Sequence, residues 1–327
     1  MNTLLRRART PAKDYSDCSG CSLCLLVCPV WRSTRDLGMT ARGRAKALQH
    51  GALAADIAPS IQSCSLCAAC ATVCPEDIDL VAMTLDLRRA LAQSAAVPDL
   101  PTMTTARIAA APTPSARVAL LAGRALRERA GSLARVAALL GGAEAVATHL
   151  DNGADIALAL ESGLRIPAQR LEGFLAPLRP LQKIVVSDGL LLRHLHRWLP
   201  RSRIKSLGEA LSSNTSVRRA LRASDMYVID ARAYHADYER LVKYYDGLRR
   251  ECGCSFNLDL QRIAIPAAAP GLGQTPEADD DGAQARWILQ GRQVARIVVE
   301  SLDERAVFER VSGLPVVHLA DLADIGT

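Results

Sequence analysis

The sequence predicts an α-helical N-terminal domain followed by an α/β domain of tandem βα units. Aromatic residues make up only 4% of the 327 residues, so aliphatic side chains must fill the core, which favours helices and α/β layers over an all-β sandwich. Apolar residues recur at helical spacing before residue 95, whereas short aliphatic runs alternate with helical patterns after residue 117. We expect the helical domain at 1–97, a linker at 98–116 and the α/β domain at 117–327.

Two helical patterns mark the N-terminal domain. Residues 78–91 are predicted to form one helix. An apolar stripe with helical spacing is formed by Leu48, Leu53, Ile57 and Ile61. The linker is predicted because four prolines lie among Thr, Ala and Ser residues between 98 and 116.

The remaining chain alternates strand-like and helix-like segments. Buried parallel strands are predicted at 118–121, 184–186, 227–229, 297–299 and 316–317. Helices are predicted at 133–140, 171–178, 236–248 and 305–311. This order indicates βα units around parallel sheets, with a loop rich in Gly, Pro and Asp at 270–283.

The charge pattern excludes some classes of protein. The formal net charge is +6, but the arginines are scattered rather than interleaved with aromatics, so we expect no nucleic-acid partner and at most a positive electrostatic field that favours an acidic protein partner.

The sequence has no run of 18 apolar residues, so no transmembrane segment is predicted. Residues 8–11 after Arg6 and Arg7 are not apolar, which indicates a short basic leader rather than an export signal. We expect a cytoplasmic chain, peripheral to the inner membrane only through a partner.

Eight of the ten cysteines form two runs of identical spacing, and each cysteine of the first run recurs 46 residues later. The runs are Cys18-Ser-Gly-Cys21-Ser-Leu-Cys24-Leu-Leu-Val-Cys28-Pro29 and Cys64-Ser-Leu-Cys67-Ala-Ala-Cys70-Ala-Thr-Val-Cys74-Pro75. In a reducing compartment, clustered cysteines indicate metal binding rather than disulfides.

The spacing within each run favours two [4Fe–4S] clusters. Three thiolates separated by two residues can wrap one face of a cubane, whereas the fourth lies too far round and reaches the cluster of the other run. We therefore predict that cluster 1 is held by Cys18, Cys21, Cys24 and Cys74. Cluster 2 is then held by Cys64, Cys67, Cys70 and Cys28. The alternative is structural zinc, which more often pairs two C-x2-C elements over a longer gap.

The cysteine runs and the segment between them resemble a known family. Cys28-Pro29-Val30-Trp31, followed by Thr40-Ala41-Arg42-Gly43-Arg44-Ala45, resembles the iron–sulfur subunits of glycolate oxidase and anaerobic glycerol-3-phosphate dehydrogenase. It is also similar to the ferredoxin-like subunit of heterodisulfide reductase. Those proteins carry Pro-Arg-Gly-Arg between the runs, and Ala41 stands here in place of the proline. The resemblance covers roughly residues 10 to 95 and implies an α-helical ferredoxin domain.

The C-terminal region resembles the same families in layout. There it is a tandem of cysteine-rich domains named for Cys-Cys-Gly motifs, some of which bind a further, non-cubane cluster. Here residues 230–235 resemble a His-Asp-Pro-Cys-His element, and residues 300–303 stand where a late Cys-x-x-Cys is found. Only Cys252 and Cys254 remain, in a Cys-Gly-Cys sequence. We therefore expect a degenerate CCG-like domain that has kept the fold, lost the metal and serves as a docking scaffold.

The resemblance implies an electron-transfer subunit of a larger oxidoreductase. It would pass single electrons between a flavoprotein dehydrogenase, whose FAD or FMN lies on the partner subunit, and a downstream acceptor, either a quinone or an electron-transfer flavoprotein. A quinone reductase is a further candidate partner. One alternative is a heterodisulfide-reductase-like catalytic subunit that acts on a disulfide or another small substrate. Another is a redox-sensing or assembly protein with structural clusters. No catalytic residues are predicted on this chain.

Cys252 and Cys254 are interpreted as ordinary thiols near a turn, because C-x-C alone is a weak metal signal, and a redox pair is the alternative. Arg232, Tyr234 and His235 follow a predicted strand, where ligand loops of α/β sheets lie. They are interpreted as packed or surface residues, with a role at a pocket or a flavin partner as the alternative.

His194 and His196 lie in a basic helix with Arg193 and Arg197. We expect these four side chains on a solvated helix face.

Overall fold

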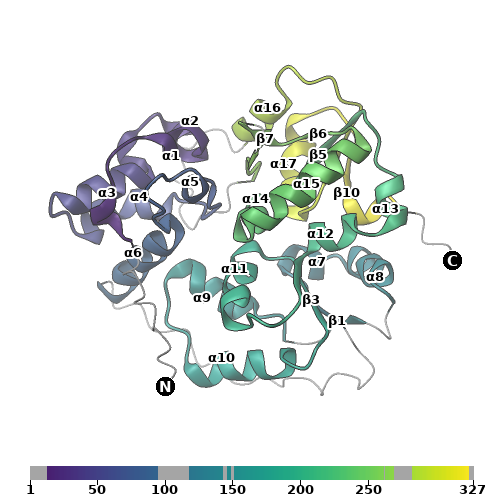
Figure 1. Cartoon of the computed structure of the whole chain (residues 1–327), viewed down its shortest axis with the longest axis horizontal. Coiled ribbons are helices and arrows are strands. Elements are labelled where there is room, and N and C mark those ends of the chain that lie inside the picture. The colour runs from purple at the N-terminus through teal and green to yellow at the C-terminus, as the bar shows by residue number, and fades with distance from the viewer. Residues whose placement is uncertain are drawn as a thin grey trace, which may run out of the picture.

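A computed structural model describes residues 13–94, 118–142, 146–148, 151–260, 262–268 and 282–323. A helical N-terminal domain lies beside an α/β region that has two lobes (Figure 1). The basic leader up to residue 12, the linker at 98–116 and most of the loop at 270–283 lie outside the described residues. The predicted order of a helical domain followed by parallel α/β layers is confirmed.

The N-terminal domain consists of short helices. They are α1 (Leu23–Val27), α2 (Pro29–Thr34), α3 (Ala41–Gln49), α4 (Ala58–Gln62), α5 (Ala69–Thr72) and α6 (Leu80–Ser94). Single 3-10 turns lie at η1 (Tyr15–Asp17), η2 (Leu37–Met39) and η3 (Ala54–Ile57). The helix predicted at 78–91 is confirmed as α6.

The apolar stripe from Leu48 to Ile61 does not form one helix. The α3 helix ends at Gln49, and Gly51 takes a left-handed conformation with φ +88°, which turns the chain away. The chain then forms η3 and restarts as α4, with Pro59 in the first turn. The residues of the predicted stripe therefore lie in separate helices and turns. Leu53 does not belong to a buried face, because it is 69% exposed.

Two parallel four-stranded sheets form the α/β region. The first lobe contains β1 (Val118–Leu121), β2 (Val146–Ala147), β3 (Lys183–Val186) and β4 (Ile204–Ser206), in the order β2-β1-β3-β4. The second lobe contains β5 (Asp225–Val228), β6 (Ser255–Phe256), β9 (Arg296–Val299) and β10 (Val316–His318), in the order β10-β9-β5-β6. Counted along the chain, both sheets have the same topology. A short antiparallel pair, β7 (Leu258–Asp259) and β8 (Ile263–Ala264), follows β6.

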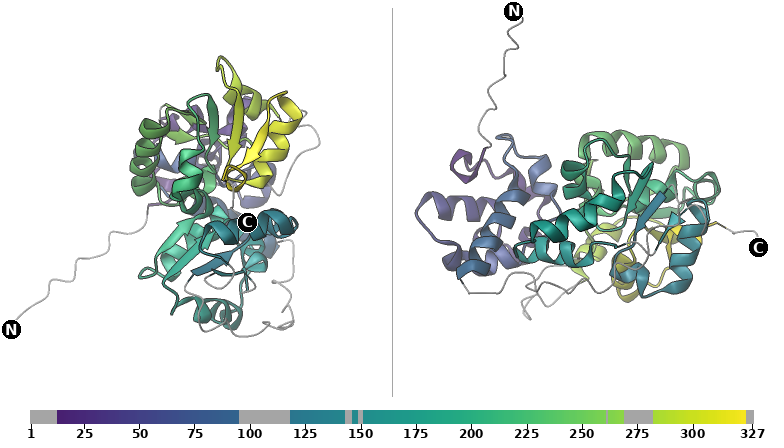
Figure 2. Two further views of the ribbon diagram at one scale, coloured as in Figure 1. Left: turned by 90° about the vertical axis from the view of Figure 1, so that its right-hand side faces the viewer. Right: turned by 90° about the horizontal axis from the view of Figure 1, so that it is seen from below.

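Helices cover both sheets, as the views in Figure 2 show. Those of the first lobe are α7 (Arg124–Arg127), α8 (Ala130–Leu139), α9 (Ala154–Ser162), α10 (Ala168–Leu175) with η4 (Ala176–Leu178), and α11 (Gly189–Trp198). The later ones are α12 (Leu207–Ser212), α13 (Thr215–Arg219), α14 (Ala231–Ala236), α15 (Tyr238–Cys252), α16 (Ala283–Leu289), α17 (Leu302–Val311) and η5 (Leu319–Asp321). The helix predicted at 236–248 is α15, which begins after Asp237 breaks the chain at φ −140° and ψ 53°.

The two lobes share one hydrophobic core. Leu120 and Val185 of the first sheet belong to the same buried cluster as Tyr227 and Val298 of the second. Because burial of such side chains contributes about 1.5–3 kcal/mol each, the lobes are held together by the same effect that holds each sheet. No helix among the described residues is long and apolar enough to cross a membrane.

Three arginines fix the N-terminal domain to the α/β region, and Arg88 is the buried one among them. Arg88 of α6 donates to the carbonyl of Glu161 at the end of α9 (2.7 Å) and to that of Cys64 (2.6 Å). Arg193 and Arg197 of α11 both pair with Asp79, at 2.7 and 2.8 Å. The α11 helix therefore contacts the neighbouring domain.

The expected solvated face of α11 is consequently wrong for most of its residues. His194 and His196 are both half-buried, and burial lowers the pKa of each. His194 Nδ1 lies 2.9 Å from the carbonyl oxygen of Leu190. Sequence alone did not show that a second domain covers this helix.

A buried carboxyl organises the second lobe. Tyr227 and Tyr245 donate hydrogen bonds to Glu300 Oε1 at 2.7 and 2.6 Å, and the backbone N–H of Asp230 donates to Oε2 at 2.9 Å. Burial nevertheless raises the pKa of Glu300 from 4.5 to about 7. The folded protein therefore holds this proton at pH values where the unfolded chain has lost it.

We expect this carboxyl to make stability fall as the pH rises. Its contribution is fully present below pH 4.5 and is lost as the pH rises through about 7. The loss is on the order of 3 kcal/mol, at about 1.4 kcal/mol for each unit of pKa shift. Glu300→Gln cannot ionise, so its melting temperature should fall less between pH 5 and pH 8 than that of the wild type. The control is Glu239→Gln, at an exposed position of α15. Parallel pH profiles for Glu300→Gln and the wild type would contradict this prediction.

Candidate metal centres

The two cysteine runs fold in the same way. In the first run, Gly20 and Ser22 take left-handed conformations with φ of +81° and +71°. The residues 46 positions later, Leu66 and Ala68, do the same with φ of +55° and +63°. Non-glycine residues rarely adopt this conformation, because the Cβ atom approaches the backbone carbonyl. Its occurrence at matching positions shows that each loop is bent to direct its cysteines inward.

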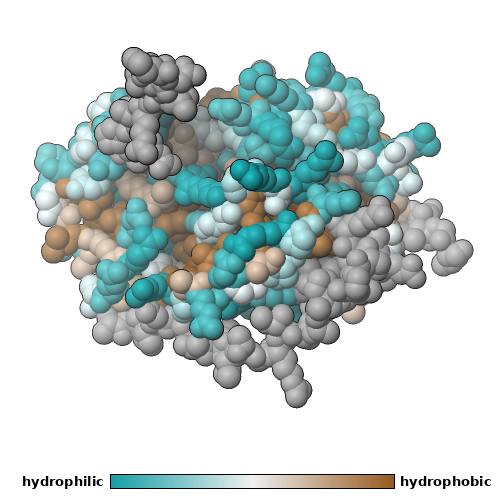
Figure 3. Space-filling model, turned by 60° about the horizontal axis from the view of Figure 1, so that its bottom comes forward, coloured by the Kyte–Doolittle hydropathy of each residue, from teal (hydrophilic) through white to brown (hydrophobic). Residues whose placement is uncertain are grey.

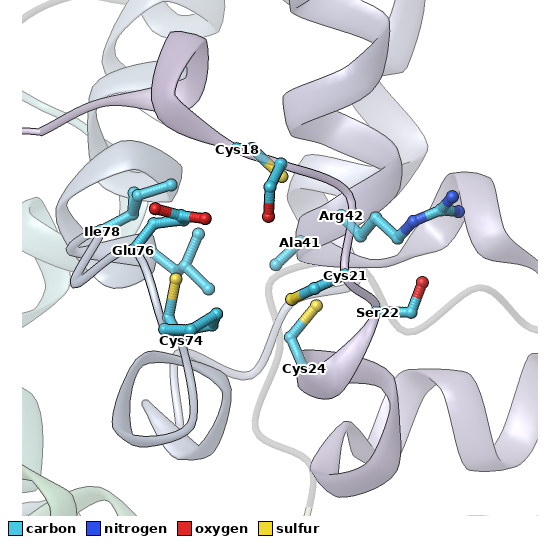
Figure 4. A pocket seen from close by; sticks show the side chains of 12 residues that line it. Cys18, Cys21, Ser22, Cys24, Ala41, Arg42, Cys74, Glu76 and Ile78 are labelled. Atoms are coloured by element: carbon cyan, nitrogen blue, oxygen red, sulfur yellow. The ribbon is translucent and has the colours of Figure 1, made fainter.

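The first cavity lies under the first run (Figure 4). Its cysteines are Cys18, Cys21, Cys24 and Cys74. The first three come from the loop before α1 and from α1 itself, whereas Cys74 comes from the second run. Cys21 is exposed, and Ile78 and Arg42 complete part of the wall. This cavity is therefore close to the protein surface.

The second cavity is deeper. Its cysteines are Cys28, Cys64, Cys67 and Cys70. Cys28 is the N-cap of α2, and Pro29 occupies the first helical position. Proline suits this position because the backbone N–H that it lacks would have no partner within the helix. Cys74 differs because it precedes a turn rather than a helix, and α6 begins only at Leu80.

The structure thus brings the eight cysteines together as two groups of four, each drawn from both runs. This grouping fits the crossed assignment of ligands, which itself stays a prediction. The chemistry of the walls also fits a cubane, since backbone N–H groups lie against the sulfurs: those of Arg42 at Cys24, Trp31 at Cys28, Leu66 at Cys64 and Ala69 at Cys67. Such N–H groups stabilise the charge on cluster-bound thiolates.

The α3 helix stands between the cavities. Ala41 and Leu80 line both of them, Arg42 lines the first and Arg44 lines the second. Thr40 caps the helix by accepting a hydrogen bond from the N–H of Gly43 at 3.1 Å. Ala41 therefore occupies the first helical position, where proline is equally compatible, and its presence in place of proline leaves this helix start intact. Two small or aliphatic side chains separate the centres.

Burial and charge set the thiol pKa values differently. Burial raises the pKa of Cys67 to about 11 and raises that of Cys70 well above its usual range. Burial also opposes ionisation of Cys64, but Arg44, the N–H of Leu66 and Arg88 together lower its pKa. The second cavity therefore has a positively charged side at Cys64.

Arg44 supplies much of that charge. It is only 2% exposed, and it donates to the carbonyl of Ser60 at 2.8 Å, while its Nε has no hydrogen-bond partner among the described residues. A nearby positive charge favours the reduced, more negative state of a cluster. The effect is on the order of 2 kcal/mol, or about 90 mV for one electron, at an effective dielectric constant near 20.

We therefore expect Arg44→Gln to lower the midpoint potential of one cluster by up to about 90 mV and to leave the other nearly unchanged. A redox titration followed by electron paramagnetic resonance measures both. Arg35→Gln, on the exposed end of α2, is the control and should shift neither. Equal shifts of both potentials, or no shift with full iron content, contradict the assigned role of Arg44.

Residues 14–78 match the family model of the 4Fe-4S dicluster domain. This match supports an iron–sulfur protein. The match covers both cysteine runs, and it supports cluster binding by several cysteines and a function in electron transfer. No curated protein and no solved structure matches the chain. The number of clusters and the glycolate oxidase or heterodisulfide reductase subfamily remain predictions.

Arg232 and His235 contact the second cysteine loop from the α/β region. Arg232 Nε donates to the carbonyl of Ser65 at 2.7 Å, and its Nη2 pairs with Glu161 at 2.8 Å. His235 Nδ1 lies 2.7 Å from the carbonyl oxygen of Cys67, and burial lowers its pKa to about 4, so the ring is a neutral donor. Tyr234 donates to the carbonyl of Arg262 at 2.8 Å. His235 and Tyr234 are packed, as interpreted from sequence, and Arg232 also lines a pocket.

Cys252 and Cys254 lie apart from both cysteine cavities. Cys252 ends α15, Gly253 caps it at φ +71°, and Cys254 is buried with its thiol 3.1 Å from the carbonyl oxygen of Arg222. A hydrogen bond from Cys254 lowers the pKa of Cys252 to about 7 and raises that of Cys254. Neither residue lines a cavity with the other eight.

Sequence reasoning gave no role to Arg44 and Arg88. A signal for Arg88 was present: it follows Val81 and Leu85 at helical spacing, so it lies on the apolar face of α6. An arginine on the buried face of a helix needs several acceptors, and here backbone carbonyls at Ile61, Gln62, Cys64 and Glu161 supply them.

Proposed function

We propose that this protein is the electron-transfer iron–sulfur subunit of a multi-subunit oxidoreductase. The observation that carries the proposal is the grouping of eight cysteines around two cavities that share Ala41 and Leu80 as walls. A [4Fe–4S] cluster in each cavity supplies one-electron transfer, for which a flavin is the natural two-electron partner. The surrounding residues of this chain position the cysteines, exclude water and set the charge around each cavity.

The surface of the N-terminal domain supports contact with a partner at the first cavity. Figure 3 shows hydrophobic side chains gathered on one face of the molecule, among hydrophilic ones. Near the first cavity, α1 carries two exposed leucines, Leu23 and Leu26, which follow the exposed Cys21, and Leu26 is 57% exposed. Apolar side chains beside a redox centre are typical of a surface that a protein partner covers. We therefore assign exchange with the partner to the first cavity.

The α/β region is assigned the part of a docking scaffold derived from a tandem CCG-like arrangement. Its two sheets have the same topology, which supports an origin as a repeat. Electrons would pass between a flavoprotein dehydrogenase that carries FAD or FMN and a downstream acceptor, either a quinone reductase or an electron-transfer flavoprotein. Disulfide chemistry of the heterodisulfide reductase kind is less favoured, because Cys252 and Cys254 lie at neither cysteine cavity.

The test is an anaerobic purification of the tagged protein from its own host, with flavin analysis of the eluate. We expect a flavoprotein to co-purify in a fixed ratio and its substrate to reduce the iron centres, seen by electron paramagnetic resonance. Leu26→Glu should weaken the complex without loss of iron, whereas Leu158→Glu, at an exposed position of α9, should leave the complex intact. A co-purified flavoprotein whose substrate leaves the iron centres oxidised overturns the proposal.

A further inference from the structure

A cleft between the two lobes lies at the carboxyl ends of both parallel sheets. Residues one or two positions after the ends of β3, β5 and β9 line a cavity of about 200 Å³: Ser187 and Asp188, Asp230, and Ser301. A neighbouring cavity of about 540 Å³ shares Ser187, Asp188, Ser301, Asp303 and Glu161 with it and extends to Gly123 after β1. Open α/β sheets bind their ligands at this edge. We call the two cavities together the interlobe cleft.

The helix starts at this cleft are already capped by side chains of the protein. Asp188 accepts from the N–H of Leu191 at 2.7 Å, Asp230 from that of Ala233 at 3.0 Å, and Ser301 from that of Asp303 at 3.3 Å. Two of these caps are carboxylates, which compensate the positive ends of the helices. The helix starts therefore leave little attraction for an anion.

The remaining charges of the cleft are mostly negative. Asp303 and Glu304 point from the first turn of α17, and no described cation forms an ion pair with either of them. Arg232 pairs with Glu161 and donates to the carbonyl of Ser65. Acidic side chains thus outnumber the single arginine that lines the smaller cavity.

Glu304 carries the most direct sign of a missing partner. Its side chain lines the smaller cavity, the residue is only 5% exposed, and Oε2 has no hydrogen-bond partner among the described residues. Oε1 accepts a hydrogen bond from the N–H of Ala267 at 3.2 Å. Burial, with the neighbouring Asp230, raises the pKa of Glu304 well above its usual range. A buried polar atom without a partner costs about 1–3 kcal/mol, which a bound donor would recover.

The rest of the lining fits an organic ligand rather than a bare ion. Ala231, Pro266 and Ala268 supply an apolar wall, and a volume of about 200 Å³ is far larger than one metal ion needs. Asp303 and Glu304 are neighbours in the first turn of α17, and both line the smaller cavity, so they can meet different N–H groups of one ligand.

We propose that the interlobe cleft binds a small organic ammonium ion, with its N–H groups at Asp303 and Glu304 and its carbon chain against Ala231, Pro266 and Ala268. This site goes beyond the proposed function and does not depend on it. Because Ser65 and Cys67 of the second cysteine loop also line the smaller cavity, the ligand would lie beside that loop. The binding energy comes from hydrogen bonds of the ammonium N–H groups to the two carboxyls and from burial of the carbon chain.

Isothermal titration of the anaerobically purified protein, with its iron in place, tests the site. The probes are n-butylammonium chloride, the neutral n-butanol, sodium butyrate and magnesium chloride. We expect n-butylammonium to bind at one site with a dissociation constant of about 1 mM or tighter, and n-butanol to bind at least about 10-fold more weakly. Asp303→Asn and Glu304→Gln should each weaken n-butylammonium binding about 10-fold or more. Glu172→Gln, whose carboxylate pairs with Arg179 on the exposed side of α10, should leave it unchanged.

Unaltered binding of n-butylammonium by both cleft variants overturns the proposal, as does stronger binding of butyrate or magnesium at this site. Absence of n-butylammonium binding to a protein with full iron content also overturns it. Glu304→Gln is isosteric and neutral, so it should keep the fold, which the visible absorption of the iron centres reports. A protein without iron would instead contradict the proposed function, so the two failures are distinguishable.

Discussion

Cys74→Ser is expected to remove the same iron centre as Cys21→Ser, although Cys74 belongs to the second run. The side chains of both line the first cavity, where Cys18 and Cys24 also lie. Loss of one thiolate from a four-cysteine site usually prevents assembly of the cluster, so each variant should hold about four irons instead of about eight. Iron analysis of anaerobically purified protein measures the loss.

Double variants decide whether the ligands are crossed. Cys21→Ser with Cys74→Ser should lose no more iron than either change alone, because both act on one centre. Cys21→Ser with Cys28→Ser should lose nearly all of it, since Cys28 lines the second cavity. Cys252→Ser is the control and should keep full iron content. The reverse pattern of the two double variants would show that each run ligates its own cluster.

Gly163→Ala is expected to weaken the packing of the N-terminal domain against the α/β region and so to lower the melting temperature. Gly163 ends α9 at φ +74°, and an added Cβ would collide with the backbone carbonyl carbon of Arg88 on α6. Left-handed strain and this contact with backbone atoms together should cost about 2–4 kcal/mol. The melting temperature should fall by about 5–10 °C, as scanning calorimetry measures.

The matched control is Gly247→Ala, in the middle of α15, where an added Cβ meets nothing within 4 Å. This change should be neutral or stabilise by up to about 1 kcal/mol, because alanine favours a helix more than glycine. Equal melting temperatures for Gly163→Ala and the wild type would contradict the close packing of α9 on α6. Retained iron in a destabilised Gly163→Ala variant would place the damage at the domain contact rather than at the cysteines.

The repeat of cysteines made the nature of the site predictable. Identical spacing, with Pro29 and Pro75 after the fourth cysteine of each run, indicates how many ligands each loop offers. The left-handed conformations at Leu66 and Ala68 were not predictable, because these residue types do not favour them, and only the ligand geometry gives them a purpose.

The parallel strands were also predictable, because continuous aliphatic runs such as 184–186 and 297–299 are typical of strands buried on both faces. Long-range contacts were not. The pairing of Arg193 and Arg197 with Asp79, and the position of Arg44 at the second cavity, depend on how distant segments pack. The interlobe cleft likewise appears only when both sheets are in place.

The content of iron, acid-labile sulfide and zinc should be measured in protein purified and kept under anaerobic conditions. Two four-cysteine sites predict about eight irons and about eight sulfides per chain, with an electron paramagnetic resonance signal from two interacting reduced clusters. Zinc in place of iron, or about four irons that no cysteine variant of the second cavity can remove, would contradict this prediction.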